Sequence, residues 1–177
     1  LALAATMENS GTLLACDTDK RRLGNLPPRA ARAGAGLIET MLLDPGRELE
    51  ALRPWQAQAD AVLIDAPCSG TGTWRRKPEA KWRLTPQRLA QFGGVQDRLL
   101  DIAARLVKPG GRLVFVTCSL LDAEGADRFA AFLEGHPTWT GDRPDLPLGR
   151  ERGEGIRLSP ARDETDGFFI ARAFLPC

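Results

Sequence analysis

An α/β fold built on a mostly parallel, doubly wound sheet is predicted by two observations. Strand-like apolar runs alternate with helix-like segments, and residues 61–64 form a continuous apolar run typical of a strand buried on both faces of a parallel sheet. Carboxylates or thiols directly follow several such runs, where open α/β sheets bind their ligands. The 177 residues, 43% hydrophobic and 27% charged, suit a single domain spanning residues 1–177 with a substantial core.

The N-terminal third of the chain shows short elements separated by polar and glycine-containing turns. Apolar periodicity, helix caps and proline positions together place their boundaries. The elements expected in order are the remainder of a helix at 1–9, a strand at 11–16 ending at Asp17, a helix capped by Thr18 or Asp19, an interruption at Pro27-Pro28, a strand at 37–43 ending at Asp44, and a weak helix at 48–58 broken at Pro54.

The rest of the chain shows stronger periodicity. Thr85-Pro86 is typical of a helix start, and a stripe of apolar residues at helical spacing continues from there to a glycine-containing turn. The elements expected in order are the strand at 61–64, this long helix, the turn at 108–111, a strand at 112–117, a helix at 122–134, a surface loop at 141–154, and a final antiparallel hairpin made of 155–158 and 168–174.

The stretch from Asp65 to Gly72 follows the strand at 61–64 directly, and it combines a carboxylate, a rigid proline, a thiol and two glycines. In one interpretation Asp65 caps a turn and Cys68 is a small buried apolar residue. In the other the stretch is an active-site loop. Cys118 favours the second interpretation, because it follows another strand, so two thiols stand at the ends of two predicted parallel strands.

Composition excludes several classes of protein. The four cysteines contain no Cys-x-x-Cys pair and there is one histidine, so no structural zinc site is expected and the thiols are expected to be reduced. No apolar run approaches the ~20 residues that cross a bilayer, and the first five residues lack a basic leader, so a soluble cytoplasmic protein without a membrane partner is expected. The net charge of +1 does not bear on nucleic-acid binding.

The segment 74–83 has five cations and two tryptophans in ten residues. Cationic groups can meet phosphates while indole rings stack on bases, as in proteins that hold single-stranded nucleic acid. The alternative is a solvated loop whose tryptophans pack on the body of the protein, and this is favoured when the segment is considered alone.

Five stretches, considered together, resemble the RNA cytosine-C5 methyltransferase family, the Sun/RsmB-type ribosomal RNA enzymes. Their order and spacing match over nearly the whole chain, which is far more specific than any single motif. They are Asp-Ala-Pro-Cys-Ser-Gly-Thr-Gly at 65–72, Arg-Lys-Pro-Glu-Ala-Lys-Trp at 76–82, Lys-Pro-Gly-Gly at 108–111, Thr-Cys-Ser-Leu at 117–120 and Asp-Gly-Phe-Phe-Ile-Ala at 166–171.

The resemblance implies a Rossmann-like sheet, S-adenosylmethionine as the cofactor and RNA, in particular ribosomal RNA, as the partner. It implies that Cys118 is the nucleophile, that Cys68 assists product release and that Asp65 contacts the cytosine ring. It further implies cofactor contacts from Asp17 at the ribose, Asp44 on the adenine side, Asp65 and Pro67, and RNA contacts from Arg75, Arg76, Lys77, Lys81 and Thr117.

The family's chemistry explains why two thiols are needed. Cytosine C5 is a poor nucleophile, so a thiolate adds at C6 and makes C5 enamine-like; C5 then takes the methyl group and loses its proton, and the thiol is eliminated. A free thiol of pKa ~8.5 is only a few per cent ionised at neutral pH, so the site is expected to favour the thiolate or to remove its proton. DNA cytosine-C5 enzymes place the nucleophile on the Pro-Cys motif, so Thr117-Cys118 favours RNA.

One part of the family pattern is missing from the sequence. The family's first strand and the glycine-rich loop that cradles the cofactor's methionine part would lie just before Leu1. We therefore expect the chain to be an N-terminally truncated catalytic domain that also lacks the family's upstream RNA-binding region. The same departure motivates a second hypothesis, a non-catalytic RNA-binding or ribosome-assembly module that keeps the methyltransferase fold.

Overall fold

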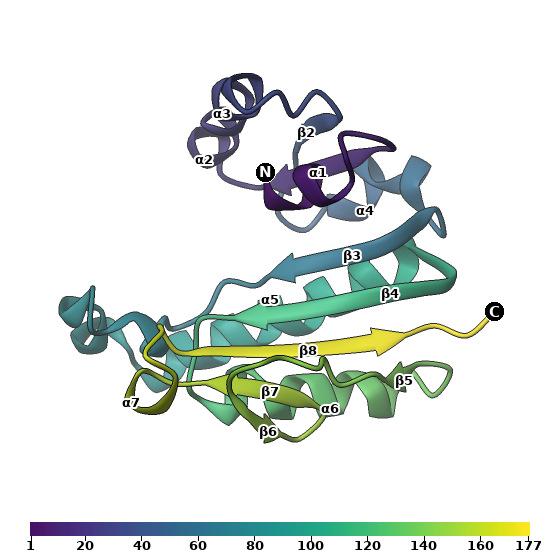
Figure 1. Cartoon of the computed structure of the whole chain (residues 1–177). Coiled ribbons are helices and arrows are strands. Elements are labelled where there is room, and N and C mark those ends of the chain that lie inside the picture. The colour runs from purple at the N-terminus through teal and green to yellow at the C-terminus, as the bar shows by residue number, and fades with distance from the viewer. The chain divides into compact units, whose positions relative to one another are not determined.

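The structure is a computed structural model that describes residues 1–177. It consists of two compact units, Leu1–Pro54 and Trp55–Cys177, and each is described by itself. Helices and strands alternate through most of the chain, and parallel strand pairs occur in both units (Figure 1), which confirms the predicted α/β class. None of the helices is long and apolar enough to cross a membrane.

The first unit is built on two parallel strands that pair from Leu13 with Ile38 to Asp17 with Leu42. Its small core is rich in alanine and includes Ala4, Ala30 and Ala35. Its elements, with the 3₁₀ helix that spans the boundary between the units, are α1 (Ala2–Thr6), β1 (Leu13–Asp17), α2 (Lys20–Gly24), α3 (Leu26–Arg32), β2 (Ile38–Leu42), α4 (Glu48–Ala51) and η1 (Arg53–Trp55).

Two local expectations in this unit concern helix boundaries. Asp19 caps α2 as predicted, because its carboxylate accepts hydrogen bonds from the backbone N–H groups of Arg21 and Arg22. Pro27-Pro28 was expected to interrupt the segment, and the helix does break here, at Asn25 between α2 and α3, with both prolines in the first turn of α3. The first helical turn tolerates proline because its N–H groups have no intrahelical partner to lose.

The second unit contains a six-stranded sheet in the order β3-β4-β8-β7-β6, with β5 also paired to β8. β3 and β4 run parallel, whereas β8 pairs antiparallel with both β4 and β7, which confirms the predicted C-terminal hairpin (Figure 1). The elements are β3 (Ala59–Asp65), η2 (Thr71–Thr73), η3 (Pro78–Arg83), α5 (Pro86–Leu106), β4 (Val107–Thr117), η4 (Asp122–Glu124), α6 (Ala126–Gly135), β5 (Thr140–Gly141), β6 (Arg150–Arg152), β7 (Gly155–Leu158), α7 (Pro160–Asp163) and β8 (Phe168–Phe174).

Two expectations in this unit need correction. The turn expected at 108–111 is part of β4, where Gly110, at φ +78°, donates its N–H to Leu175 and so ties this end of the strand to the chain after β8. The loop expected at 141–154 contains β6. All three residues of β6 are exposed and charged, so no apolar alternation marked it as a strand.

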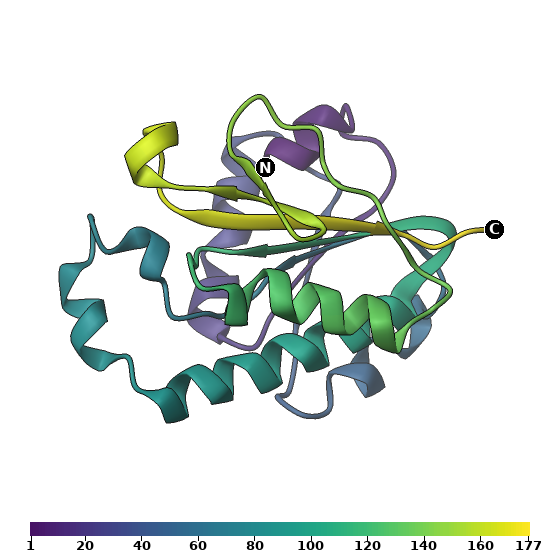
Figure 2. The ribbon, with the colours of Figure 1, turned by 90° about the horizontal axis from the view of Figure 1, so that it is seen from below.

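α5 and α6 cover one face of this sheet (Figure 2). Thr85 caps α5 as predicted, since its hydroxyl accepts the N–H of Arg88 at 3.2 Å. Three phenylalanines pack between sheet and helices: Phe115 of β4 stacks on Phe129 of α6 at 6.3 Å between ring centroids and meets Phe169 of β8 edge-on. Burial of each ring stabilises the unit by roughly 1.5–3 kcal/mol, so the sheet is a rigid support for the loops at its edge.

Candidate active site

The loops that carry the two predicted reactive thiols leave the same edge of the sheet. β3 and β4 are parallel and in register, with Ile64 opposite Phe115 and Asp65 opposite Val116, so both strands end together. The backbone N–H of Ala66 extends the pairing by donating to Val116 at 2.9 Å. Just beyond, the Sγ atoms of Cys68 and Cys118 lie 3.4 Å apart, within hydrogen-bonding distance.

The two loops are also joined to each other by hydrogen bonds that backbone N–H groups donate. The N–H of Gly72 donates to the carbonyl of Cys118 at 3.1 Å, and the N–H of Leu120 donates to the Thr71 hydroxyl at 2.8 Å. A third segment joins them, because the N–H of Gly167 donates to the carbonyl of Gly72 at 2.8 Å. A Cβ atom on Gly72 would lie 2.0 Å from the Gly167 oxygen, so this approach requires glycine.

A buried carboxylate holds the polar side chains of both loops. Glu124 of η4 is fully buried and accepts hydrogen bonds from the Ser69 backbone N–H at 2.8 Å, from the Ser69 hydroxyl and from the Ser119 hydroxyl at 2.7 Å. Ser69 follows Cys68 and Ser119 follows Cys118, so Glu124 acts on the neighbours of both thiols. Sequence reasoning missed Glu124, because it lies at the start of an expected helix, where acidic residues are common.

α5 supports the first loop through another buried side chain. Gln96 is fully buried, and its Nε2 donates to the carbonyl of Pro67 at 2.8 Å, while its Oε1 has no hydrogen-bond partner. The sequence placed Gln96 in the apolar stripe of this helix, where the only sign of a polar role was its chemical type.

The contact between the thiols favours thiolate at one of them. The hydrogen bond with Cys68 lowers the pKa of Cys118 to about 7, against the opposing effects of burial and of the Asp65 charge. The same hydrogen bond, together with burial, raises the pKa of Cys68 far above its usual range. A protonated Cys68 therefore donates to an ionised Cys118, and Cys118 is the better nucleophile at neutral pH.

The predicted cofactor residues lie at strand ends in both units. Asp17, at the end of β1, is partly buried, and its Oδ1 accepts the N–H of Asp19 at 2.8 Å. Asp44, after β2, is exposed. Asp65 and Pro67, at and after the end of β3, have exposed side chains next to the thiols in the chain.

The basic segment 74–83 is held at its start and exposed further along. Arg76 forms an ion pair with Asp166, and Arg75 lies 3.8 Å from the same carboxylate. The two tryptophans differ: Trp74 buries its indole nitrogen, whereas Trp82 is 79% exposed with the Lys81 ammonium 4.6 Å from its ring centroid.

The remaining predicted RNA contacts also differ in exposure. Lys77 and Lys81 are exposed. Thr117, in contrast, is fully buried and its hydroxyl has no hydrogen-bond partner, so the expectation that its side chain contacts RNA does not agree with its position here. The sequence placed Thr117 at the strand end next to Cys118, but strand alternation turns its side chain into the core, with Phe115.

Comparison with known proteins identifies a family for almost the whole chain. The family model described as 16S rRNA methyltransferase RsmB/F matches residues 2–174. A probable ribosomal RNA small subunit methyltransferase B from Bacillus subtilis is 33% identical over 177 residues, covering 95% of this chain. The corresponding Thermus thermophilus protein is 39% identical over 128 residues, covering 71% of this chain.

A solved structure supports the same fold. NSun6 from Pyrococcus horikoshii, solved with SFG, superposes with a TM-score of 0.84 at 25% identity, covering 97% of this chain and 43% of its own. The chain spans 38% of the length of the Bacillus subtilis relative and 32% of that of the Thermus thermophilus relative.

Proposed function

This chain belongs to the RsmB/F family of 16S rRNA methyltransferases, and we propose that it forms one catalytic domain that methylates C5 of cytosine in ribosomal RNA, with S-adenosylmethionine as the cofactor. The observation that carries the proposal is the pair of thiols 3.4 Å apart at the ends of two parallel strands. Cytosine C5 needs covalent activation and later release, and a paired thiol and thiolate suit both steps.

Cys118 begins the reaction. With its pKa near 7, about half of it is thiolate at neutral pH, compared with a few per cent of an ordinary cysteine. The sulfur forms a bond to C6 of cytosine, and the π electrons of the C5–C6 double bond move toward C5 and the ring. C5 thereby becomes the nucleophile. The Asp65 carboxylate, at the end of β3, is available to accept a hydrogen bond from the exocyclic amino group of cytosine and so to hold the base during this step.

The carboxylates at the carboxyl ends of the strands suit the hydrogen-bond donors of the cofactor. S-adenosylmethionine supplies an electrophilic methyl group when bound. Asp17 fits its ribose, because only Oδ1 of the carboxylate is occupied by the Asp19 N–H, which leaves Oδ2 to accept from hydroxyl groups. We assign Asp44 to the adenine side, and Asp65 and Pro67 to the same ligand.

Cys68 assists release. After methyl transfer the C5 proton leaves to water, its bonding electrons restore the C5–C6 double bond, and the S–C6 bond breaks to return the Cys118 thiolate. The protonated Cys68 is placed to donate to that sulfur as negative charge returns to it. The departing thiolate is thereby stabilised.

The test is incubation of the full-length protein with methyl-labelled S-adenosylmethionine and small-subunit ribosomal RNA. We expect methyl transfer to cytosine C5, lost in Cys118→Ala and retained in the control Cys16→Ala, because Cys16 lies on β1, outside the thiol pair. Methyl transfer at the wild-type rate by Cys118→Ala would contradict the assignment of Cys118 as the nucleophile. Faster methyl transfer to duplex DNA than to RNA would contradict the assignment of RNA as the substrate.

One observation favours a second candidate, a non-catalytic RNA-binding module. Trp82 exposes 79% of its surface beside Lys81, which suits base stacking and needs no cofactor. Calorimetry of the full-length protein with S-adenosylmethionine separates the candidates, because a catalytic domain binds the cofactor and a binding module does not.

A further inference from the structure

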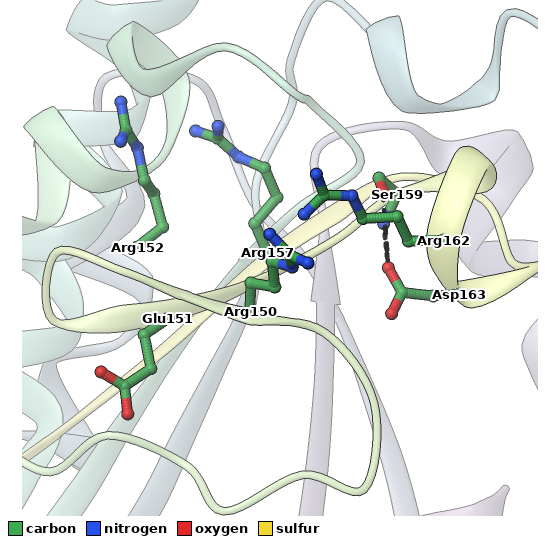
Figure 3. Close-up of a pocket in the computed structure, with 7 residues that line it drawn as sticks. All are labelled: Arg150, Glu151, Arg152, Arg157, Ser159, Arg162 and Asp163. Atoms are coloured by element: carbon green, nitrogen blue, oxygen red, sulfur yellow. Dashed lines mark hydrogen bonds between the residues drawn. The ribbon is translucent and has the colours of Figure 1, made fainter.

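A cavity of about 300 Å³ lies among β6, β7 and α7, and arginines dominate its lining (Figure 3). None of its residues belongs to the two-thiol site. Four of the seven lining residues are arginines, and the set is Arg150, Glu151, Arg152, Arg157, Ser159, Arg162 and Asp163. We call it the arginine pocket.

Strand pairing brings three of these arginines to one face of the hairpin. Arg150 pairs with Arg157 directly across β6 and β7, and Arg152 lies two residues along on the same face. Glu151 points to the opposite side (Figure 3), where its carboxylate binds Arg143 at 2.9 Å. Like charges directly opposite on a sheet are destabilising, so this face carries an electrostatic cost unless anions reach it.

The carboxylates around the pocket neutralise only part of this charge. One residue, Asp122 of η4, pairs with both Arg152 and Arg157. Asp163 is occupied by backbone donors, accepting the N–H groups of Gly149 at 2.9 Å and Ser159 at 2.7 Å.

Two guanidinium groups of the pocket are left available. Arg150 and Arg162 are exposed and form no hydrogen bond or close ion pair through their side chains, although Arg150 interacts electrostatically with Asp163. The Nε of Arg157 is buried without a hydrogen-bond partner. The pocket therefore has free donors and a surplus of positive charge.

We propose that the arginine pocket binds a phosphate group of the RNA strand whose cytosine enters the two-thiol site; the identity of this ligand rests on the proposed function. Guanidinium groups match phosphate oxygens in pairs, and a phosphodiester offsets the repulsion between Arg150 and Arg157. The ligand is a backbone phosphate because nothing in the lining is suited to a base: it includes no aromatic side chain.

The pocket is connected to the thiol loops through η4. Asp122, which holds Arg152 and Arg157, lies in the same 3₁₀ helix as Glu124, which holds Ser69 and Ser119. An RNA phosphate in the pocket is thus attached to the element that also organises the thiols. This shared support favours a substrate strand over an unrelated anion.

The experiment measures binding of a fluorescein-labelled, single-stranded fragment of small-subunit ribosomal RNA at several salt concentrations. In Arg150→Ala/Arg162→Ala we expect Kd to rise about tenfold or more, because two charge-assisted contacts are lost. The salt dependence should also weaken, by about 0.7 in the log–log slope for the one phosphate contact. The control Arg88→Ala/Arg105→Ala removes the same charge from α5 and should leave Kd within about twofold.

Further measurements keep the outcome decisive. Arg150→Lys/Arg162→Lys should recover part of the affinity, since charge returns without the planar fork. If the alanine variant does not fold by circular dichroism, arginine Nε–H NMR signals of the wild-type protein titrated with inorganic phosphate replace it. Equal Kd values in the wild-type and alanine proteins would overturn the proposal that the arginine pocket binds phosphate. So would the absence of any shift of the Arg150 and Arg162 signals with phosphate.

The two proposals fail separately. Loss of RNA affinity in the alanine variant together with absence of methyl transfer by the wild-type protein would retain the pocket and reject the proposed function. Methyl transfer with unchanged RNA affinity in the alanine variant would do the reverse. Binding of inorganic phosphate without any effect of the variant on RNA would reject RNA as the ligand.

Discussion

The carboxylate of Glu124 accepts a hydrogen bond from the backbone N–H of Ser69 at 2.8 Å, although the two residues are 55 positions apart in the chain. Through the hydroxyl of Ser119 the same carboxylate holds the second thiol loop. No other buried acidic side chain contacts both loops, so the distance between Cys68 and Cys118 depends on this one group as well as on the sheet.

Replacement of Glu124 with alanine should destabilise the second unit. The change leaves the Ser69 N–H and the Ser119 hydroxyl without their buried acceptor, at a cost of about 2–4 kcal/mol in the free energy of unfolding. Chemical denaturation measures it. Glu134→Ala, at an exposed position on α6, is the matched control and should change stability by less than about 0.5 kcal/mol. Equal effects of the two substitutions would contradict a buried, organising role for Glu124.

Gly72 should tolerate no side chain. A Cβ atom there would lie 2.0 Å from the backbone oxygen of Gly167, which directly precedes β8 and donates its N–H to the carbonyl of Gly72. Gly72→Ala should therefore lower the free energy of unfolding by about 1–3 kcal/mol, as overpacking does. Gly94→Ala is the matched control, because Gly94 lies on α5 with open space around it and alanine there should stabilise by up to about 1 kcal/mol. Thermal unfolding of both variants gives the comparison.

The proximity of the two thiols could be predicted because it depends on local patterns. Each cysteine follows a recognisable apolar strand, and parallel strands end at one edge. The roles of Glu124, of Asp166 beside Arg76, and of Arg150 opposite Arg157 could not be, because each depends on contacts between distant segments. β6 escaped prediction for a related reason, since its exposed, charged residues leave strand pairing as its only signature.

Trp82 should contribute to RNA binding and not to folding. Its side chain is 79% exposed, so Trp82→Ala should leave the free energy of unfolding within about 0.5 kcal/mol of wild type. Loss of one stacked base should weaken RNA binding by about 1–3 kcal/mol. Trp82→Phe keeps an aromatic ring and should retain most of the affinity. RNA binding is measured by fluorescence anisotropy. Equal Kd values for the alanine variant and the wild-type protein would show that the Trp82 indole does not stack on a base.

The reactivity of Cys118 should rise as pH increases through about 7. Its pKa is lowered by the hydrogen bond from Cys68, so the thiolate is the main form above pH 7 and the thiol below it. The measurement is the rate of iodoacetamide alkylation at Cys118 against pH, followed by mass spectrometry in a Cys16→Ser/Cys177→Ser background that removes the two exposed thiols.

Cys68→Ala in that background should move the alkylation midpoint upward, to the ordinary cysteine value or above it. The stabilising hydrogen bond is lost while burial and the Asp65 charge still oppose ionisation. The thiolate fraction at pH 7 should then fall roughly tenfold or more. An unchanged midpoint would mean that Cys68 does not donate to Cys118.

Cys68→Ala should also trap the covalent RNA–protein intermediate. Cys118 still attacks C6, but the departing sulfur has lost its hydrogen-bond donor at 3.4 Å, so the S–C6 bond breaks more slowly. The covalent adduct should appear on a denaturing gel as a shift in size equal to that of the RNA. It should form faster at pH 8.5 than at pH 7, because the variant's Cys118 needs the higher pH to ionise.

Cys68→Ala/Cys118→Ala is the control for the covalent intermediate and should form no adduct. An adduct that persists in this double variant would place the covalent bond on another residue, whereas none in Cys68→Ala at either pH would remove Cys68 from the release step.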